Sequence, residues 1–222
     1  MNASWRQIET AHFMLFYDER DRALAEVWSR RIDEDFERVI SDLALDAPER
    51  RFSFWLCPDV ASFMDCAGIT PETYASWMVG NADYDQGKLC ILSPRVVTDR
   101  PPEAMDTVVT HEIVHMAMDA LCPGDECPVW LGEGIATLYA GQVYAKSVEA
   151  CPLICEMERD FPGCGGYDYA GAYVWYLIKR YGMERFKRVY AGEEPVAAML
   201  YPGFERDAVA AWQSSITANP AG

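Results

Sequence analysis

The stretch "TDRPPEAMDTVVTHEIVHMAMDALCPG", residues 98–124, separates two parts of the chain that differ in character. It opens with a Thr/Asp/Pro cluster, carries acidic residues in its first turn and ends at Pro123 and Gly124. These are start and stop signals of a helix. The residues around its two histidines are apolar on nearly every side, so we expect a buried helix at which the two parts of the chain meet.

Strands and helices alternate in residues 1–100. Alternating, aromatic-rich runs predict strands, and apolar residues at helical spacing predict helices with a charged outer face. The predicted strands are "HFMLFYDE" (12–19), "RFSFWLCP" (51–58) and "KLCILSP" (88–94), and the predicted helices cover 20–45 and 59–68. This half of the chain is therefore expected to form a small mixed α+β lobe.

Helical patterns dominate the second half of the chain. We expect helices in "PVWLGEGIATLYAGQVYA" (128–145), in "YAGAYVWYLIKRYG" (169–182) and in most of the tail from Glu184 onward. The predicted fold class is α+β, with a single domain spanning residues 1–222. It comprises an α+β lobe (1–100), the histidine-bearing helix (101–120) and a helical lobe (121–222).

Length and composition predict a globular protein. The chain has 222 residues, half of them hydrophobic and seven of them tryptophan, which suffices for a sizeable core. The net charge of −16 argues against a nucleic-acid partner, because phosphates would be repelled.

No apolar run approaches the ~18 residues of a transmembrane helix. The first residues do not resemble a signal peptide, so we expect that a leader was removed and a start methionine supplied. The oligomeric state is left open.

The eight cysteines indicate the redox state of the cellular compartment in which the protein functions. An even number at this density favours disulfides and an oxidising environment, so we expect a secreted, periplasmic or cell-surface protein, with reduced thiols in the cytoplasm as the alternative. Cys122 and Cys127 flank the short loop "CPGDEC" and form the best local pair. A metal knuckle of Cys151, Cys155 and Cys164 has little support, because no CxxC spacing accompanies it.

The pentad "HEIVH" carries the strongest chemical signal. On a helix, His111 and His115 lie on one face about one turn apart, so both imidazoles can bind one cation. Glu112 is offset from His111 by about 100° and can instead take a proton from a metal-held water. Two histidine ligands and one glutamate that accepts a proton are the roles that the HExxH motif assigns to these positions. The alternative is two histidines that share a helix by chance.

A catalytic zinc ion needs a third protein ligand and one open position. Residue 121 is leucine, which excludes a third histidine at the spacing of the extended HExxHxxGxxH motif. Glu133 is the natural alternative, since it lies 18 residues after His115 on the next predicted helix and in an apolar stretch. Gly132 and Gly134 flank it and remove side chains where helix backbones must approach closely. The alternative for Glu133 is a solvated helix carboxylate.

"HEIVH" followed by "PVWLGEGIA" resembles the gluzincin metallopeptidases, particularly the small peptidase MA-like domains, which pair HExxH with W-x-x-E-G-x-A. "AHFMLFYDE" is similar to the family's opening strand, and residues 167–190 are similar to its later aromatic helix. The resemblance implies a zincin-like fold with the metal site between an N-terminal α/β lobe and a helical C-terminal lobe. It implies His111, His115 and Glu133 as ligands of one zinc ion.

The resemblance also implies roles for residues outside the ligand set. Glu112 would be the general base, and Tyr167 would hydrogen-bond the developing oxyanion, with Tyr169 and Tyr173 as competitors. "GNADYDQGKLCIL", residues 80–92, lies where such enzymes place an edge strand that pairs with substrate backbone, and a plain turn is the alternative. The Gly-x-Met-Glu-Asn box of related aminopeptidases is missing, which argues against an aminopeptidase.

Three functions follow from these features. The first is a zinc-dependent metallopeptidase that acts on a peptide or protein substrate, with endo- or exopeptidase action left open. The second is a catalytically silent zinc-binding scaffold or adaptor with a peptidase-like fold. The third is a non-enzymatic cell-surface module in which the pentad is accidental. The presence of Glu112 favours the first, because a purely structural metal site does not need it.

Overall fold

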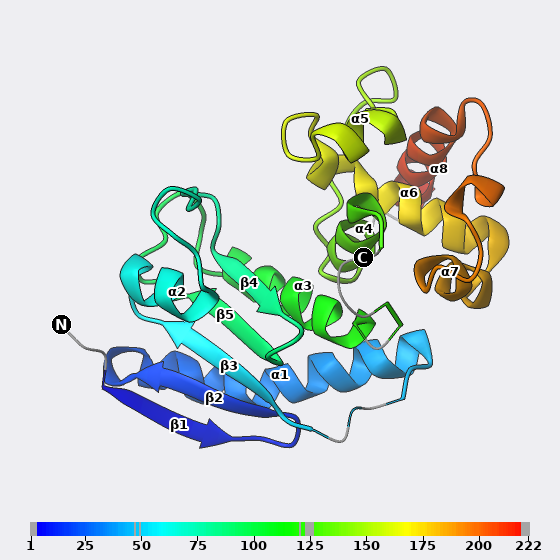
Figure 1. Ribbon diagram of the computed structural model, residues 1–222. Coiled ribbons are helices and arrows are strands. Elements are labelled where there is room, and N and C mark those ends of the chain that lie inside the picture. The colour runs from blue at the N-terminus through cyan, green and yellow to red at the C-terminus, as the bar shows by residue number, and fades with distance from the viewer. Residues whose placement is uncertain (1–3, 47, 49, 120, 123–126, 219–222) are drawn as a thin grey trace. The chain divides into compact units, whose positions relative to one another are not determined.

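The computed structural model describes residues 4–46, 48, 50–119, 121–122 and 127–218 (Figure 1). The chain divides into two compact units, residues 1–120 and residues 121–222. The first is mixed α/β and the second contains helices and no strand among its described residues. The predicted helix stop at Pro123 and Gly124 lies outside the described residues.

One five-stranded sheet forms the centre of the first unit. Its strand order is β1-β2-β3-β5-β4, in which β2, β3 and β5 run parallel and the two edge strands run antiparallel to their neighbours. The strands are β1 (Trp5–Glu9), β2 (Phe13–Asp18), β3 (Phe52–Cys57), β4 (Gly80–Asp83) and β5 (Lys88–Leu92). The three predicted strands are confirmed as β2, β3 and β5, whereas β1 was not predicted.

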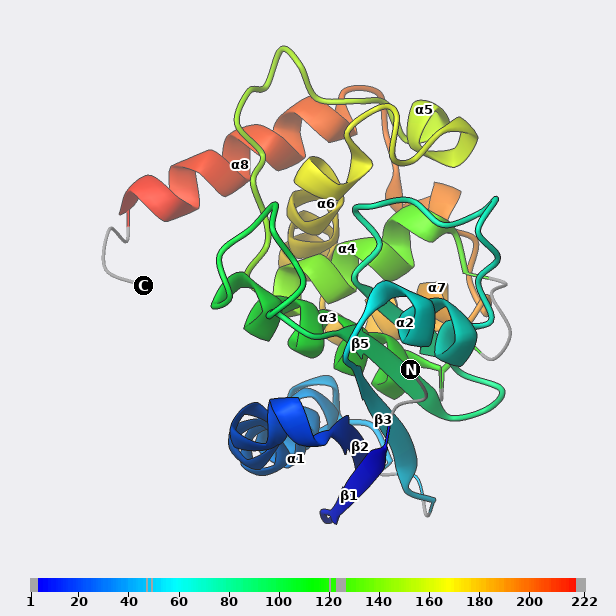
Figure 2. The same cartoon turned by 90° about the vertical axis from the view of Figure 1, so that its left-hand side faces the viewer.

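Helices cover both faces of this sheet, as Figure 2 shows. The rings of Trp28 and Phe54 pack together at 6.0 Å, which places α1 on the face that carries Phe54. Side chains alternate along a strand, so Trp55 lies on the opposite face. There, α2 packs against β3 and β5. The helices of this unit are the 3-10 turn η1 (Glu19–Asp21), α1 (Arg22–Leu43), α2 (Val60–Ala67) and α3 (Ala104–Met118).

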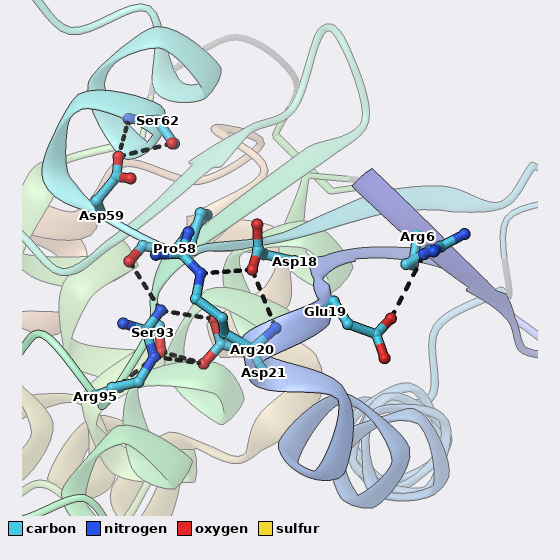
Figure 3. Close-up of polar contacts among 10 residues, drawn as sticks. All are labelled: Arg6, Asp18, Glu19, Arg20, Asp21, Pro58, Asp59, Ser62, Ser93 and Arg95. Atoms are coloured by element: carbon cyan, nitrogen blue, oxygen red, sulfur yellow. Dashed lines mark hydrogen bonds and ion pairs between the residues drawn. The ribbon is translucent and has the colours of Figure 1, made fainter. Parts of the chain in front are cut away.

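A buried polar network ties together the carboxyl ends of the parallel strands (Figure 3). Asp21, just after β2, is 5% exposed and accepts a 2.8 Å hydrogen bond from the Ser93 hydroxyl, just after β5. Arg95 pairs with Asp21 at 3.2 Å and also donates to the carbonyl of Pro58, just after β3, at 3.1 Å. The buried carboxylate is thus paired with a cation and hydrogen-bonded, which a buried charge requires.

In the second unit, α6 is the central helix. It packs against α4, α7 and α8. A Cβ atom on Gly134 would lie 2.7 Å from the Ala170 carbonyl oxygen, so this glycine permits the close approach of α4 to α6. Gly132 has no such role, because its Cβ would meet only the Tyr190 hydroxyl at 3.6 Å. The elements are α4 (Val129–Tyr139), α5 (Ile154–Arg159), α6 (Gly166–Tyr181), α7 (Met183–Tyr190), η2 (Val196–Met199) and α8 (Phe204–Ala218).

Two further expectations can be compared with the structure. All eight cysteines lie among the described residues and none of them forms a disulfide there, so the predicted disulfides, including the pair Cys122 and Cys127, are not found. Within the described residues, none of the helices combines the length and apolarity of a membrane span. The sheet with flanking helices confirms the mixed α/β class of the first lobe. The zincin-like arrangement and the location of a metal site between two lobes stay predictions.

Candidate metal centre

The histidine-bearing helix α3 is fixed firmly on α1. Most of its side chains are buried, and polar contacts set its rotation about its own axis. The Thr110 hydroxyl donates to Asp35 Oδ2 at 2.9 Å, and the Trp28 indole donates to Asp106 Oδ1 at 3.0 Å. Arg31 also pairs with Asp106. Two of these anchors lie one turn apart on α3, so the direction in which the intervening and following residues point is well defined.

Helical spacing brings the two histidines together as predicted. The Nε2 atoms of His111 and His115 lie 3.1 Å apart, and the ring centroids lie 4.8 Å apart. A tetrahedral zinc ion with zinc–nitrogen distances of about 2.0–2.1 Å holds two ligand nitrogens roughly 3.3 Å apart. The separation of the imidazole nitrogens is therefore close to that of a chelating pair. The two Nε2 atoms therefore point toward each other and not into separate regions of solvent.

Glu133 completes a group of three ligand atoms. One atom from each of His111, His115 and Glu133 lies within 4.8 Å of the other two, so this group could hold a metal ion. Glu133 is half-buried on α4, and Leu131 and Ile135, two residues before and after it in the sequence, are buried. Two imidazole nitrogens and one carboxylate oxygen form a donor set that suits Zn²⁺ and leaves a fourth position open.

Glu112 lies outside this group of three and against the sheet. It is 9% exposed, and a Cβ atom on Gly80 of β4 would lie 2.5 Å from its Oε1 atom and 2.8 Å from Val108 Cγ1. The glycine therefore makes room for the Glu112 carboxylate beside the edge strand. No signal in the sequence identified Gly80 as part of the site, because its role depends on how β4 packs against α3.

The segment 80–92 forms a hairpin, and its first strand is an edge of the sheet. β4 pairs with β5 from Gly80 opposite Ile91 to Asp83 opposite Lys88, and a turn at residues 84–87 connects them. Within the described residues, β4 is the last strand on its side. The ring of Tyr84 lies 6.3 Å from that of His115. For this segment the sequence allowed either an edge strand or a plain turn. The structure confirms an edge strand, and this strand lies next to the histidine-bearing helix.

The three candidate tyrosines of α6 have different surroundings. Tyr173 is fully buried and donates a 2.7 Å hydrogen bond to the Pro152 carbonyl, and burial raises the pKa of its hydroxyl. Tyr169 is also buried, whereas Tyr167 is 37% exposed and packs edge-on against Phe161 at 4.8 Å. Tyr173 thus has a structural hydrogen bond, and the role of Tyr167 in catalysis stays a prediction.

Comparisons with known proteins assign neither a family nor a function to this chain. The chain matches no family model, no curated protein and no solved structure. The candidate metal centre therefore depends on its own geometry. Among the described residues, His111, His115 and Glu133 form a group whose ligand atoms lie close enough to hold a metal ion. Cys151, Cys155 and Cys164 do not form such a group there, so a metal knuckle of these cysteines has no support.

Proposed function

We propose that this protein is a zinc-dependent metallopeptidase of the gluzincin type with a zincin-like fold. The observation that supports it best is the convergence of one atom each from His111, His115 and Glu133 within 4.8 Å. A second carboxylate, Glu112, follows the first histidine directly but belongs to a different face of α3. This division into three ligands and one separate base is the arrangement that hydrolysis by a metal-held water requires.

Each residue has a distinct part in the proposed reaction. His111, His115 and Glu133 would hold a zinc ion, which when bound would acidify a water molecule and polarise the scissile carbonyl. Glu112 would accept a proton from the attacking water and later deliver it to the leaving amine. Tyr167 is proposed to donate a hydrogen bond to the carbonyl oxygen as negative charge develops there.

We further propose that β4 binds the substrate backbone. Its outer edge has no strand partner among the described residues, and an extended peptide can pair with such an edge through main-chain hydrogen bonds. Because β4 lies beside Glu112 at Gly80, a peptide paired with its outer edge would lie near the proposed base. Binding through the backbone predicts that the enzyme tolerates varied side chains next to the cleavage site.

The decisive experiment compares two variants of the purified protein. Glu112→Gln keeps the shape of the side chain but removes the base, so it should retain about one equivalent of zinc and lose peptide hydrolysis by at least ~100-fold. Glu103→Gln, an exposed change just before the same helix, is the matched control and should retain both properties. Full activity of the Glu112→Gln variant would rule out the proposed role.

The alternative is a zinc-binding scaffold without turnover. It is separated from the peptidase by incubating the wild-type protein with a peptide library, with and without a chelator. Cleavage that the chelator abolishes and zinc restores supports the peptidase. Stoichiometric zinc without cleavage of any peptide supports the scaffold. Absence of zinc after purification in zinc-containing buffer contradicts both and favours a module in which the pentad is accidental.

A further inference from the structure

The ring of Tyr84 packs against the imidazole of His115, one of the proposed metal ligands. The two ring centroids lie 6.3 Å apart with an interplanar angle of 58°, within the range of roughly 4.5–7 Å for aromatic pairs. Tyr84 directly follows the edge strand β4, which contacts α3 (Figure 1). Side chains alternate along a strand, and a Cβ atom on Gly80 would point at Glu112, so every second residue from Gly80 onward faces α3. The ring contact shows that Tyr84 continues this series.

His115 is the more exposed of the two histidine ligands. His111 is 9% exposed and counts as buried, whereas His115 is partly exposed. A partly exposed side chain has more rotamer freedom than one enclosed by the core, and it loses that freedom when it binds a metal ion. A neighbouring ring that packs against the imidazole removes part of this freedom in advance and so reduces the entropy lost on binding.

The backbone of Tyr84 is held in place by the turn that it begins. Its carbonyl oxygen accepts hydrogen bonds from the Gly87 amide at 3.0 Å and from Arg50 Nη2 at 2.9 Å. The Arg50 guanidinium lies 5.6 Å from the centre of the Phe52 ring on β3. A Cβ atom on Gly87 would lie 3.2 Å from the guanidinium carbon, so the turn and Arg50 are closely packed. These contacts define the point from which the Tyr84 side chain extends toward His115.

We propose that Tyr84, held by Arg50, is a positioning residue whose ring keeps the His115 imidazole in the orientation that binds zinc. The inference rests on the proposed function, since it concerns a ligand of the proposed zinc ion. It assigns the effect to the ring and not to the hydroxyl, because the contact joins the two rings. Partners that orient metal ligands contribute about 10–100-fold to metal affinity, and a contact without a hydrogen bond belongs at the lower end of this range.

Zinc affinity, measured by competition with a chelator of known affinity, tests the role of the ring. We expect Tyr84→Leu to weaken zinc binding by about 10-fold and Tyr84→Phe to keep the wild-type affinity. Tyr74→Leu is the matched control, because Tyr74 is also half-buried and packs against the Phe63 ring at 6.4 Å, a pair that contains no proposed ligand. It should bind zinc as the wild type does. Wild-type affinity in Tyr84→Leu, or an equal loss in Tyr84→Phe, would overturn the proposal.

A second pair of variants leaves the Tyr84 side chain unchanged and decides the matter if Tyr84→Leu fails to fold. Arg50→Ala removes the donor to the Tyr84 carbonyl and should weaken zinc binding several-fold. Arg51→Ala is its matched control, because Arg51 pairs with Glu9 and donates to the Ala11 carbonyl at 3.2 Å, and it should leave zinc affinity unchanged. Equal zinc affinities of the two variants would contradict the proposal.

These measurements separate the positioning role from the proposed peptidase activity, because they need no substrate. A lower zinc affinity of Tyr84→Leu with normal affinity of Tyr84→Phe supports the positioning role even if no peptide is cleaved. Equal zinc affinities in a protein that hydrolyses peptides overturn the positioning role alone. A wild-type protein that binds no zinc overturns both the positioning role and the metal centre.

Discussion

Gly80 of the edge strand β4 leaves the space that the carboxylate of Glu112 on α3 occupies. A Cβ atom at residue 80 would lie 2.5 Å from Glu112 Oε1, a separation that side-chain carbons do not adopt. The proposed general base is therefore positioned by a missing side chain on a strand more than 30 residues earlier in the chain. This relationship lies entirely within the first unit and links the sheet edge to the histidine-bearing helix.

Gly80→Ala should impair the reaction without affecting the metal. The new methyl group displaces the Glu112 carboxylate or Val108, and misplacement of a catalytic group by about 1 Å can reduce the rate by roughly 100-fold. We expect kcat to fall at least ~10-fold while zinc content stays near one equivalent. Zinc analysis and peptide hydrolysis measure the two properties on the same preparation. Unchanged kcat would show that Glu112 adjusts freely and that Gly80 does not position it.

Replacing any one ligand should release zinc, and zinc should stabilise the fold. His111→Ala, His115→Ala or Glu133→Ala is expected to weaken zinc binding by more than ~100-fold, since even partners of metal ligands contribute 10–100-fold. Zinc at 100 times its Kd should stabilise the wild-type protein by about 2.7 kcal/mol. Zinc titration and thermal unfolding with and without chelator measure both effects. His12→Ala is the control, because His12 pairs with Glu37 at 3.2 Å and belongs to no candidate ligand group found among the described residues.

Thr110→Val should loosen the attachment of α3 to α1. The change keeps the shape of the side chain but removes the 2.9 Å hydrogen bond to Asp35, at a cost of about 1 kcal/mol in the free energy of unfolding. Urea denaturation measures this. The control is Thr217→Val on α8, whose exposed hydroxyl bonds the Gln213 carbonyl at 3.1 Å within the same helix and should contribute little. Equal losses from both variants would argue against a special role for the Thr110 contact.

Local periodicity predicted the long elements but not the short ones. Helices α1, α3, α4 and α6 carry long apolar patterns, and the structure has helices in each of these places. Strand β1 was missed because "WRQIE" is largely polar, as suits an edge strand with partly exposed side chains. The four residues of β4 include glycine, asparagine and aspartate, which have low strand propensity, so its structure depends on pairing with β5.

The histidine pair of the candidate site was predicted from local spacing, and Glu133 on the next helix was predicted from its place in an apolar stretch. The spacing of His111 and His115 is a local property, so it could be derived from the sequence. The surroundings of Tyr167, Tyr169 and Tyr173 depend on packing, and the three side chains proved to differ in burial. The cysteine count suggested disulfides, but whether two cysteines can form one depends on their positions in the fold, and Cys57 and Cys90 share one face of the sheet without a disulfide between them.

Asp59 should stabilise α2 at neutral pH and lose this effect in acid. Its carboxylate caps the helix by accepting from the Ser62 amide at 2.9 Å and from the Ser62 hydroxyl at 2.7 Å, as Figure 3 shows. These hydrogen bonds, first that of the amide, lower the pKa of Asp59. A carboxyl whose pKa is lowered by folding stabilises the protein above its unfolded pKa of about 3.9 and loses that contribution as pH falls through the folded pKa.

Asp59→Ala should therefore reduce the free energy of unfolding by about 1 kcal/mol at pH 7, and the difference from wild type should shrink as pH falls below roughly 4. Ser62→Ala is the matched control, because it removes the hydroxyl contact and leaves the amide contact. Its effect should be smaller at pH 7. Urea unfolding of the three proteins between pH 7 and pH 3 measures the series. A difference between Asp59→Ala and wild type that stays constant or grows in acid would show that the charged carboxylate does not stabilise α2.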